Sequence, residues 1–233
     1  MNYNIILNVE KIMAKLISYT QPTEDLIESG IETAQELVAY CARISNPTNQ
    51  YNTETSVKLV QYLIKHKHWS PLAMVDITVE IEPTRDIGRQ ILRHKSFEFQ
   101  EFSQRYSSVE DLDNIFELSE CRLQDTKNRQ SSLVNDEIEL ASWWEQSQLE
   151  LIELTSKIYK EALSRGIAKE VARKVLPEGL TKTRMYMKGS VRSWIHYLEV
   201  RLDESTQKEH REIAKLISDI ISEIFPINSY IEP

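Results

Sequence analysis

Apolar and polar side chains alternate strictly over most of the segment AMVDITVEIE, residues 73–82. A period of two residues is that of a β-strand with one buried face, and Pro83 ends the pattern. The sequence therefore predicts a half-exposed strand, with Val75, Ile77, Val79 and Ile81 on the apolar face and Asp76, Thr78, Glu80 and Glu82 on the polar face. A second short strand is predicted over residues 14–20, which Pro22 closes.

Most of the chain instead repeats its apolar positions every three to four residues, which is the spacing of a helix with one buried side. Thr84 can cap a helix that runs to about His94, and on that helix Arg85, Arg89 and Arg93 are four apart on one face. The other predicted helices span about 24–43 (hinged at Gly30), 54–66 (burying Val57, Val60, Leu63 and Ile64), 133–165 (ending before Gly166), 168–176, 189–202 and 206–224.

Helices and strands do not alternate regularly along the chain, so the pattern favours an α+β fold, rich in helices and with a small, mostly antiparallel sheet, over a doubly wound sheet. Residues 121–131 show no periodicity and are predicted to form an exposed loop. With 233 residues, sparse Gly and Pro and no linker, the chain is expected to fold as a single domain. We place that domain at residues 13–226, after an N-terminal extension of residues 1–12.

Composition narrows the function classes. No apolar run is long enough to span a membrane, and the N-terminus has no cationic lead or cleavage site of a signal peptide. The net charge of -8 and pI of about 5.3 argue against general nucleic-acid binding. Cys41 and Cys121 lie far apart, which suits free thiols and a reducing, cytoplasmic location.

Against this acidic background, RHKSFEFQEFSQRYS at residues 93–107 is locally basic. Any single arginine is more often a surface residue in an ion pair than a ligand contact. As a set the arginines suit an anion, because a guanidinium binds phosphate through two parallel hydrogen bonds. The candidates are Arg93, Arg105, Arg173, Arg192 and Arg201.

Several common sites are not supported by the sequence. It contains neither GxGxxG nor GxxxxGK[ST], so a nucleotide is not held by a Rossmann or P-loop glycine turn. No GxSxG elbow marks a serine hydrolase. The HKH triplet at residues 66–68 could suggest a metal, but no HExxH and no nearby Cys accompany it, so no metal site is predicted.

The motif RHK, followed by seven residues and Ser103 and then by Arg105, resembles the signature of the flavin-dependent thymidylate synthases. Three further segments are similar to that family in order and spacing: HWSP (68–71), EVARKVLP (170–177), and SVRSWIHYLEVR (190–201) followed by TQKEHREIA (206–214). The resemblance covers about residues 15–225. It implies conversion of dUMP to dTMP, with methylenetetrahydrofolate as carbon donor and NADPH as reductant through bound FAD, by a homotetramer whose active sites are shared between subunits.

Roles carried over from the resemblance fall into two sets. The residues implied to bind dUMP are Gln90, Arg93, Glu101, Phe102, Ser103, Gln104, Arg105, Arg173 and Arg201. Of these, Arg201 would be the catalytic residue, stabilising negative charge on the uracil ring. The residues implied to bind FAD are Ser70, Arg93, His94, Lys95, Glu101, Ser190, Val191, Arg192 and His196.

The sequence departs from the family pattern at three positions. Lys95 replaces an arginine, which keeps the charge but loses the planar fork. Ala73 and Met74 stand where Glu and His are common. These departures motivate an alternative, a degenerate homologue that binds nucleotide or flavin without turnover. A DNA-binding regulator that reads DNA with TRDIGRQILRHK (84–95) is a third possibility, disfavoured by the acidic pI and by the lack of a partner helix for a helix-turn-helix.

Overall fold

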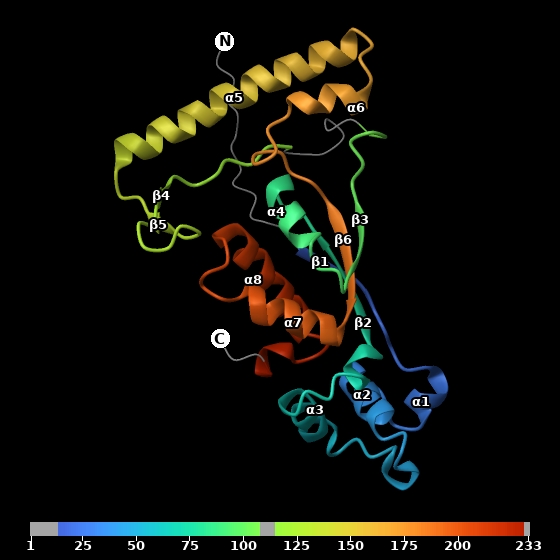
Figure 1. The fold of residues 1–233 in the computed structure, drawn as a ribbon. Coiled ribbons are helices and arrows are strands. Elements are labelled where there is room, and N and C mark those ends of the chain that lie inside the picture. The colour runs from blue at the N-terminus through green and yellow to red at the C-terminus, as the bar shows by residue number, and fades with distance from the viewer. Residues whose placement is uncertain (1–13, 108–114, 231–233) are drawn as a thin grey trace. The chain divides into compact units, whose positions relative to one another are not determined.

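The computed structural model describes residues 14–107 and 115–230. Within them the chain divides into two compact units, which are described separately. The sheet unit comprises residues 14–81, 92–100 and 185–230, and the α5 unit comprises residues 82–91, 101–107 and 115–184. Figure 1 shows the elements of both units.

Four strands form the sheet, in the order β1 (Ala14–Tyr19), β2 (Asp76–Ile81), β6 (Met185–Ser190) and β3 (Glu98–Glu101). The pairs β1/β2 and β2/β6 are antiparallel, and Ile77 of β2 is opposite Gly189 of β6. The alternation predicted for β2 is confirmed, because Val75, Ile77, Val79 and Ile81 are all fully buried. The side chains between them are half-buried.

Strand β6 was not predicted from the sequence. Its segment MYMKGS alternates buried and exposed positions, with Met185, Met187 and Gly189 inward. The helix predicted over residues 189–202 therefore starts too early: Gly189 and Ser190 complete β6, and helix α7 spans Val191–Arg201. The residues MKGS give neither a long apolar run nor a β-branched cluster, so the period of two is short and easily missed.

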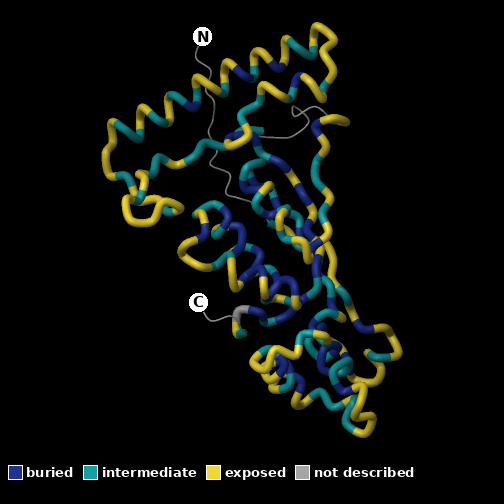
Figure 2. Tube along the Cα trace, in the orientation of Figure 1, coloured by how far each residue is buried: buried dark blue, intermediate teal, exposed yellow. Residues whose placement is uncertain are grey.

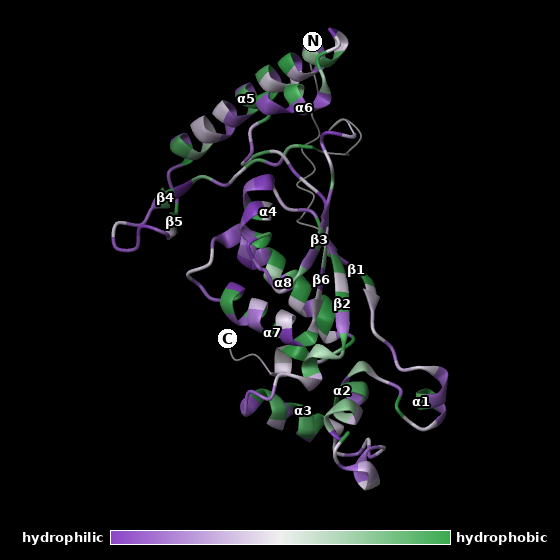
Figure 3. Ribbon diagram, turned by 45° about the vertical axis from the view of Figure 1, so that its right-hand side comes forward, coloured by the Kyte–Doolittle hydropathy of each residue, from purple (hydrophilic) through white to green (hydrophobic). Residues whose placement is uncertain are grey.

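Helices α7 and α8 (Lys208–Ser222) cover the sheet and enclose its core (Figure 2). Trp194 of α7 is fully buried, and its indole Nε1 donates to the backbone oxygen of Ile77 at 3.1 Å. Figure 3 shows hydrophobic stretches on β2 and α7. The same unit holds α1 (Glu24–Glu28) and α2 (Ala34–Ala42), separated at Gly30, whose φ of 89° is in the left-handed region.

Helix α3 (Ser56–Lys65) confirms the helix predicted near 54–66, but its buried face differs from the prediction in part. Val60 and Leu63 are buried, whereas Val57 is half exposed and Ile64 is only partly covered. Helix α8 similarly confirms the last predicted helix. Its N-terminal turn begins after Gln207.

In the α5 unit, helix α4 spans Arg85–Ile91 and ends before the predicted boundary at His94. Arg93 therefore lies beyond the helix, and the predicted stripe of three arginines on one helical face is wrong at its third member. Residues 92–97 form turns instead, ahead of β3. The extended segment expected within residues 93–107 is confirmed by β3.

The predicted exposed loop at 121–131 is also wrong in part. Arg122–Gln124 (β4) pairs antiparallel with Ser132–Val134 (β5), so the segment is a small hairpin. The long helix α5 consequently starts at Ile138 and ends at Ser164. Gly166 follows with a φ of 80°, as expected of a glycine just after a helix. Helix α6 (Lys169–Ala172) continues into the 3-10 helix Arg173–Val175.

The structure thus confirms the helix-rich α+β fold with a small antiparallel sheet. Both cysteines are free thiols. Across residues 14–107 and 115–230, no helix combines the length and apolar character needed to cross a bilayer. The N-terminal extension predicted at residues 1–12 lies outside the described residues.

Candidate active site

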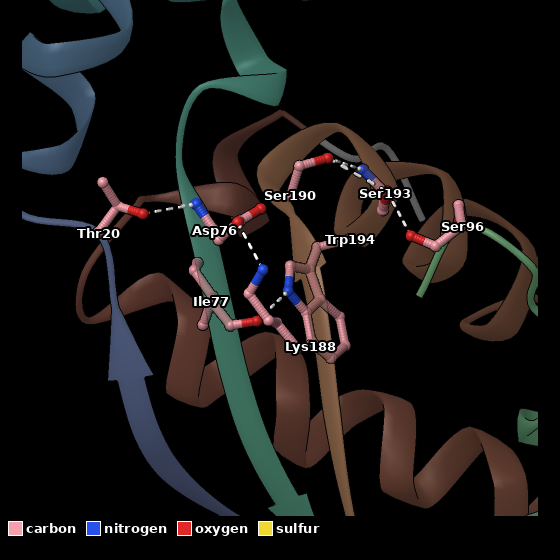
Figure 4. A network of polar contacts seen from close by, with 8 residues as sticks. All are labelled: Thr20, Asp76, Ile77, Ser96, Lys188, Ser190, Ser193 and Trp194. Atoms are coloured by element: carbon pink, nitrogen blue, oxygen red, sulfur yellow. Dashed lines mark hydrogen bonds and ion pairs between the residues drawn. The ribbon is translucent and has the colours of Figure 1, made fainter. Parts of the chain in front are cut away.

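The RHK motif lies in the turn segment between α4 and β3 and is fastened to the start of α7 (Figure 4). Ser193 Oγ of α7 donates to the backbone oxygen of Ser96 at 3.1 Å. Phe97 is buried and meets Trp194 edge to face, with ring centroids 4.7 Å apart. The motif is therefore held against the N-terminal turns of α7 by one hydrogen bond and by aromatic packing.

Gly189 makes room for this packing. A Cβ built at Gly189 would lie 2.5 Å from Cδ1 and from Cε1 of Phe97, a distance that real Cβ atoms do not tolerate. The glycine is needed here for close approach and not for its backbone angle. The sequence SFEF thus depends on a glycine that lies in a strand 92 residues later in the chain.

Arg201, the last residue of α7, meets the second residue of the RHK motif. Its Nε donates to His94 Nε2 at 2.9 Å. The side chain is half-buried, and its two terminal amino groups make no hydrogen bond with any residue in the described part of the chain. Arg201 is therefore held through its inner nitrogen, which leaves its outer donors available.

His94 can accept this hydrogen bond only if Nε2 carries no proton. Burial, together with the positive charges of Arg201 and Arg93, lowers the pKa of His94 to about 4. The imidazole is consequently neutral at physiological pH. The positive charges that act on His94 are those of Arg201 and Arg93.

Two residues that the sequence did not single out, Tyr197 and His210, pack against His94. Tyr197 hydroxyl and His210 Nε2 lie 3.1 Å apart, and both side chains are buried. Burial lowers the pKa of His210 to about 3 and raises that of Tyr197, so both are neutral. Tyr197 and Arg201 are four residues apart on α7, which puts them on one helical face, and this spacing is the signal that could have found Tyr197.

The residues expected at FAD also lie in the sheet unit. Ser190 caps α7, since its Oγ accepts from the backbone nitrogen of Ser193 at 3.3 Å. Val191 is buried and Arg192 is exposed in the first turn. His196 is exposed and meets the ring of Trp69 edge to face at 4.4 Å, next to exposed Ser70.

Polar contacts join the strands at the end of the sheet beside Ser190, as Figure 4 shows. Asp76 is opposite Ser190 in the β2/β6 register. Its carboxylate Oδ2 accepts from Lys188 Nζ at 2.8 Å, and its backbone nitrogen donates to Thr20 Oγ1 at 3.0 Å. These contacts fix the start of β2 next to the end of β6, where α7 begins.

In the α5 unit, the SQRYS segment lies beside helix α6. Arg105 Nε is 3.3 Å from Glu170 Oε2, and Lys169 Nζ donates to the backbone oxygen of Tyr106 at 3.0 Å. The segment itself is a turn, in which the backbone nitrogens of Tyr106 and Ser107 donate to the backbone oxygen of Ser103. Ser103 and Arg105 are exposed on this turn.

Arg173 follows Glu170 by three residues, on the 3-10 helix that continues α6. It is half-buried and forms no ion pair with another residue of 14–107 or 115–230. Its charge is close enough to Arg85 to lower the pKa of Arg85, after the larger effect of burial. Arg105 and Arg173 therefore lie on neighbouring segments.

The side chain of Glu101 is bound by other side chains, and that of Gln104 is buried. Glu101 Oε1 accepts from Arg85 Nη1 at 3.3 Å and from Thr183 Oγ1 at 2.9 Å. Gln104 is buried, and its Nε2 has no hydrogen-bond partner among the described residues. The other two members of the expected dUMP set in this unit, Gln90 and Phe102, are half-buried.

Comparisons with known proteins identify the family. The family model described as thymidylate synthase complementing protein matches residues 15–227. The chain is 50% identical over 212 residues to a flavin-dependent thymidylate synthase of Synechocystis, covering 91% of this chain and 95% of the relative. It is 45% identical over 213 residues to a probable flavin-dependent thymidylate synthase of Paramecium bursaria Chlorella virus 1, with the same coverage.

A solved structure agrees with the fold. The UMP/dUMP methylase PolB from Streptomyces cacaoi, determined with 5-Br dUMP, superposes with a TM-score of 0.75 over 93% of this chain and 92% of that one, at 20% identity. At this identity the likeness concerns the fold. Together with the match of the family model and the identity to curated relatives over nearly the whole length, it leads to one conclusion: the chain belongs to the flavin-dependent thymidylate synthase family.

Proposed function

We propose that this chain is a flavin-dependent thymidylate synthase that converts dUMP to dTMP. Methylenetetrahydrofolate supplies the carbon, and NADPH supplies the reducing equivalents through bound FAD. The relatives over 91% of the chain carry that name, and the structural neighbour is a methylase described with a bound bromo analogue of dUMP. Family membership makes this reaction the expected one, and the arrangement of Arg201 carries the assignment at the level of residues.

Arg201 is oriented as a uracil-binding residue should be. Its inner nitrogen is fixed on His94, and its terminal amino groups are left for a ligand. A guanidinium at the uracil edge stabilises negative charge that develops on the ring, and it does so more strongly where water is excluded. Arg201 would therefore bind the ring and promote reaction at C5.

The phosphate of dUMP would be bound by the α5 unit. Ser103, Arg105 and Arg173 provide a hydroxyl and two guanidinium groups from neighbouring segments. Charge-assisted hydrogen bonds of this kind are the strongest that a protein offers to phosphate. The buried, unpartnered amide nitrogen of Gln104 is a further donor, which suits its expected place beside the nucleotide.

The sheet unit has the donors that FAD requires. Exposed cations at Arg93, Lys95 and Arg192 form no ion pair with a carboxylate among residues 14–107 and 115–230, and Arg192 is in the first turn of an eleven-residue helix. This set fits a pyrophosphate. The flavin supplies the redox chemistry when bound, while Ser70, His196 and the 190–192 segment would orient it and exclude water.

No side chain in the described residues is prepared to attack dUMP as a thiolate. Burial raises the pKa of the Cys41 thiol, which favours the unreactive form. The Cys121 thiol contacts the amide of Asn135 and the backbone oxygen of Leu140, with no cation among these partners. A mechanism in which the protein binds and polarises dUMP without covalent attachment is consistent with both observations.

The homotetramer with shared active sites is part of the proposal. One face of α5 carries exposed Trp143, Leu151, Leu154 and Ile158 at helical spacing. Apolar surface of this kind on a soluble helix usually marks an interface. A second copy of the chain is the occupant we propose, and sedimentation of the purified protein tests it. A cytoplasmic location likewise belongs to the proposal.

The decisive experiment is tritium release from dUMP labelled at C5, with methylenetetrahydrofolate, NADPH and added FAD. We expect release that depends on all three additions, together with formation of dTMP. The Arg201→Ala variant is the control and should bind FAD while losing turnover. Protein that binds dUMP or FAD without releasing tritium would instead support the degenerate homologue, for which Lys95 and Ala73 are the motivation.

A further inference from the structure

We propose that His94 is a positioning residue for Arg201, and that the buried pair Tyr197 and His210 holds His94 in the orientation this task requires. The inference deepens the proposed function and rests on it, since it concerns the guanidinium that would bind the uracil ring. It assigns His94 the role of orienting Arg201, in addition to the contact with FAD expected from the motif. It also gives roles to Tyr197 and His210.

The position of the hydrogen bond within the guanidinium carries the argument. An arginine side chain turns about several single bonds, and one contact at a terminal nitrogen leaves its plane free to swing. His94 Nε2 instead accepts from Nε of Arg201, the guanidinium nitrogen nearest the main chain, at 2.9 Å. An acceptor at this nitrogen fixes the plane while both terminal amino groups stay available to a planar ligand edge.

His94 is suited to this because it is a neutral acceptor. A carboxylate in its place would neutralise the charge of Arg201 and compete with the uracil ring for it. The charged and titratable groups that face His94 are Arg93 on its own turn, Tyr197 and Arg201 on α7, and His210 on α8. All of them are cationic or neutral, so none of these groups around His94 offsets the positive charge of Arg201.

The ring of His94 is confined by aromatic edges from three segments. The interplanar angles are 77° with Tyr197, 89° with His210 and 87° with Phe97. Tyr197 cannot turn away without breaking its 3.1 Å contact with His210, and both side chains are buried. The contact links α7 to α8, so the position of the His94 ring depends on the packing of these two helices.

Two substitutions at His94 separate positioning from simple packing. His94→Phe keeps a ring for packing but has no acceptor. His94→Gln loses the ring but offers an amide oxygen at about the reach of Nε2. Positioning predicts that kcat falls about 10- to 100-fold in His94→Phe, as expected for a misplaced catalytic group, and that His94→Gln recovers to within about 10-fold of the parent. The KM for dUMP should change much less than kcat.

Tyr197→Phe tests the supporting pair, because it removes only the hydroxyl. It should lower kcat by about 2- to 10-fold with the aromatic packing intact. Thr181→Val is the matched control, since it also removes one buried hydroxyl, whose 2.6 Å hydrogen bond to the backbone oxygen of Pro177 involves none of the residues proposed at dUMP or FAD. It should lower the melting temperature and leave kcat close to that of the parent. Flavin content is measured for every variant.

Nitrogen NMR of histidine-labelled parent protein provides a readout that is independent of activity. We expect His94 to carry its proton on Nδ1 at neutral pH, with Nε2 unprotonated. An Nε2–H tautomer overturns the proposal. So does a folded, flavin-containing His94→Phe protein with the kcat of the parent, or a His94→Gln protein as impaired as His94→Phe. If the parent forms no dTMP, the proposed function fails, whereas the NMR result still decides whether the contact exists.

Discussion

Arg105 Nε is bound to Glu170 Oε2 at 3.3 Å, so a guanidinium expected to bind phosphate is paired with a carboxylate of the same unit. Both side chains are more than half exposed. An exposed pair of this kind is worth about 0.2–1 kcal/mol. A bound phosphate would have to compete with Glu170 for Arg105, and this competition can be measured.

Glu170→Gln should therefore tighten dUMP binding by about 1.5- to 5-fold, the equivalent of the lost competing pair. Isothermal titration with dUMP measures the change. Glu161→Gln is the matched control, because Glu161 forms a similarly exposed pair with Arg165 on α5. The control should bind dUMP as the parent does. Weaker binding by Glu170→Gln would mean that the pair organises Arg105 for phosphate and does not compete with it.

Arg173→Ala should weaken the binding of dUMP by about 1.5–3 kcal/mol, the range for a charge-assisted hydrogen bond. The reason is that Arg173 stands beside the Arg105 turn and has no carboxylate partner in the described segments. Binding of deoxyuridine, which has no phosphate, should change little. Arg165→Ala serves as the control for loss of a surface arginine. A variant that still prefers dUMP to deoxyuridine as strongly as the parent would place Arg173 outside the phosphate site.

The sequence predicts an element of this fold when the buried face of that element leaves a regular pattern of apolar residues. Strand β2 was found because its buried face gives an uninterrupted apolar alternation. The hairpin of β4 and β5 was missed because Leu123, Leu133 and Val134 are exposed, so that no buried face marks the pairing. Backbone pairing without burial leaves almost no trace in the order of residue types.

The candidate site was predictable through its motif and not through its contacts. The RHK motif and Arg201 were identified by resemblance, but the hydrogen bond between His94 and Arg201 joins residues 107 positions apart. His210 could not be found, because a single histidine on an amphipathic helix carries no signal of its partner. Only the packing of α8 beside α7 brings it to Tyr197.

The double variant Cys41→Ser, Cys121→Ser should still form dTMP, because neither thiol is prepared as a nucleophile. We expect kcat close to that of the parent and a modest loss of stability from the partly buried Cys41 site. The tritium-release assay and the melting temperature measure the two effects separately. A variant that folds and holds flavin, yet releases no tritium, would show that a cysteine takes part in the reaction.

Acid should destabilise the protein through its buried histidines. The pKa of His210 is about 3 and that of His94 about 4 in the folded chain, against about 6.5 when unfolded. Between these values the unfolded chain binds protons that the folded chain does not. The free energy of unfolding therefore falls as pH drops below about 6.5 and levels off below the folded pKa values.

Urea unfolding at a series of pH values measures this slope. Carboxylates also contribute to it, so the informative quantity is the difference between the parent and His210→Gln. The variant should be less stable at neutral pH but should lose less stability on acidification. Equal slopes in the two proteins would show that His210 takes up its proton in the folded state as readily as in the unfolded one.

Gly189→Ala should lower the free energy of unfolding by about 1–3 kcal/mol, the usual cost of overpacking a core. The new methyl group would meet the ring of Phe97, which is itself confined by Trp194. Gly179→Ala is the matched control, since no atom lies within 4 Å of a Cβ at that position. The control should be as stable as the parent, or slightly more stable because its unfolded chain is less flexible.

A double-mutant cycle identifies the contact responsible for this loss. Phe97→Leu alone should destabilise the protein, because it removes a buried ring. In the Gly189→Ala background the same change also removes the clash, so it should cost less than in the parent. A coupling of about 0.5–3 kcal/mol in this favourable direction is expected for residues in contact. Additive effects of the two substitutions would mean that Gly189→Ala is accommodated by movement of β6 and not by displacement of the Phe97 ring.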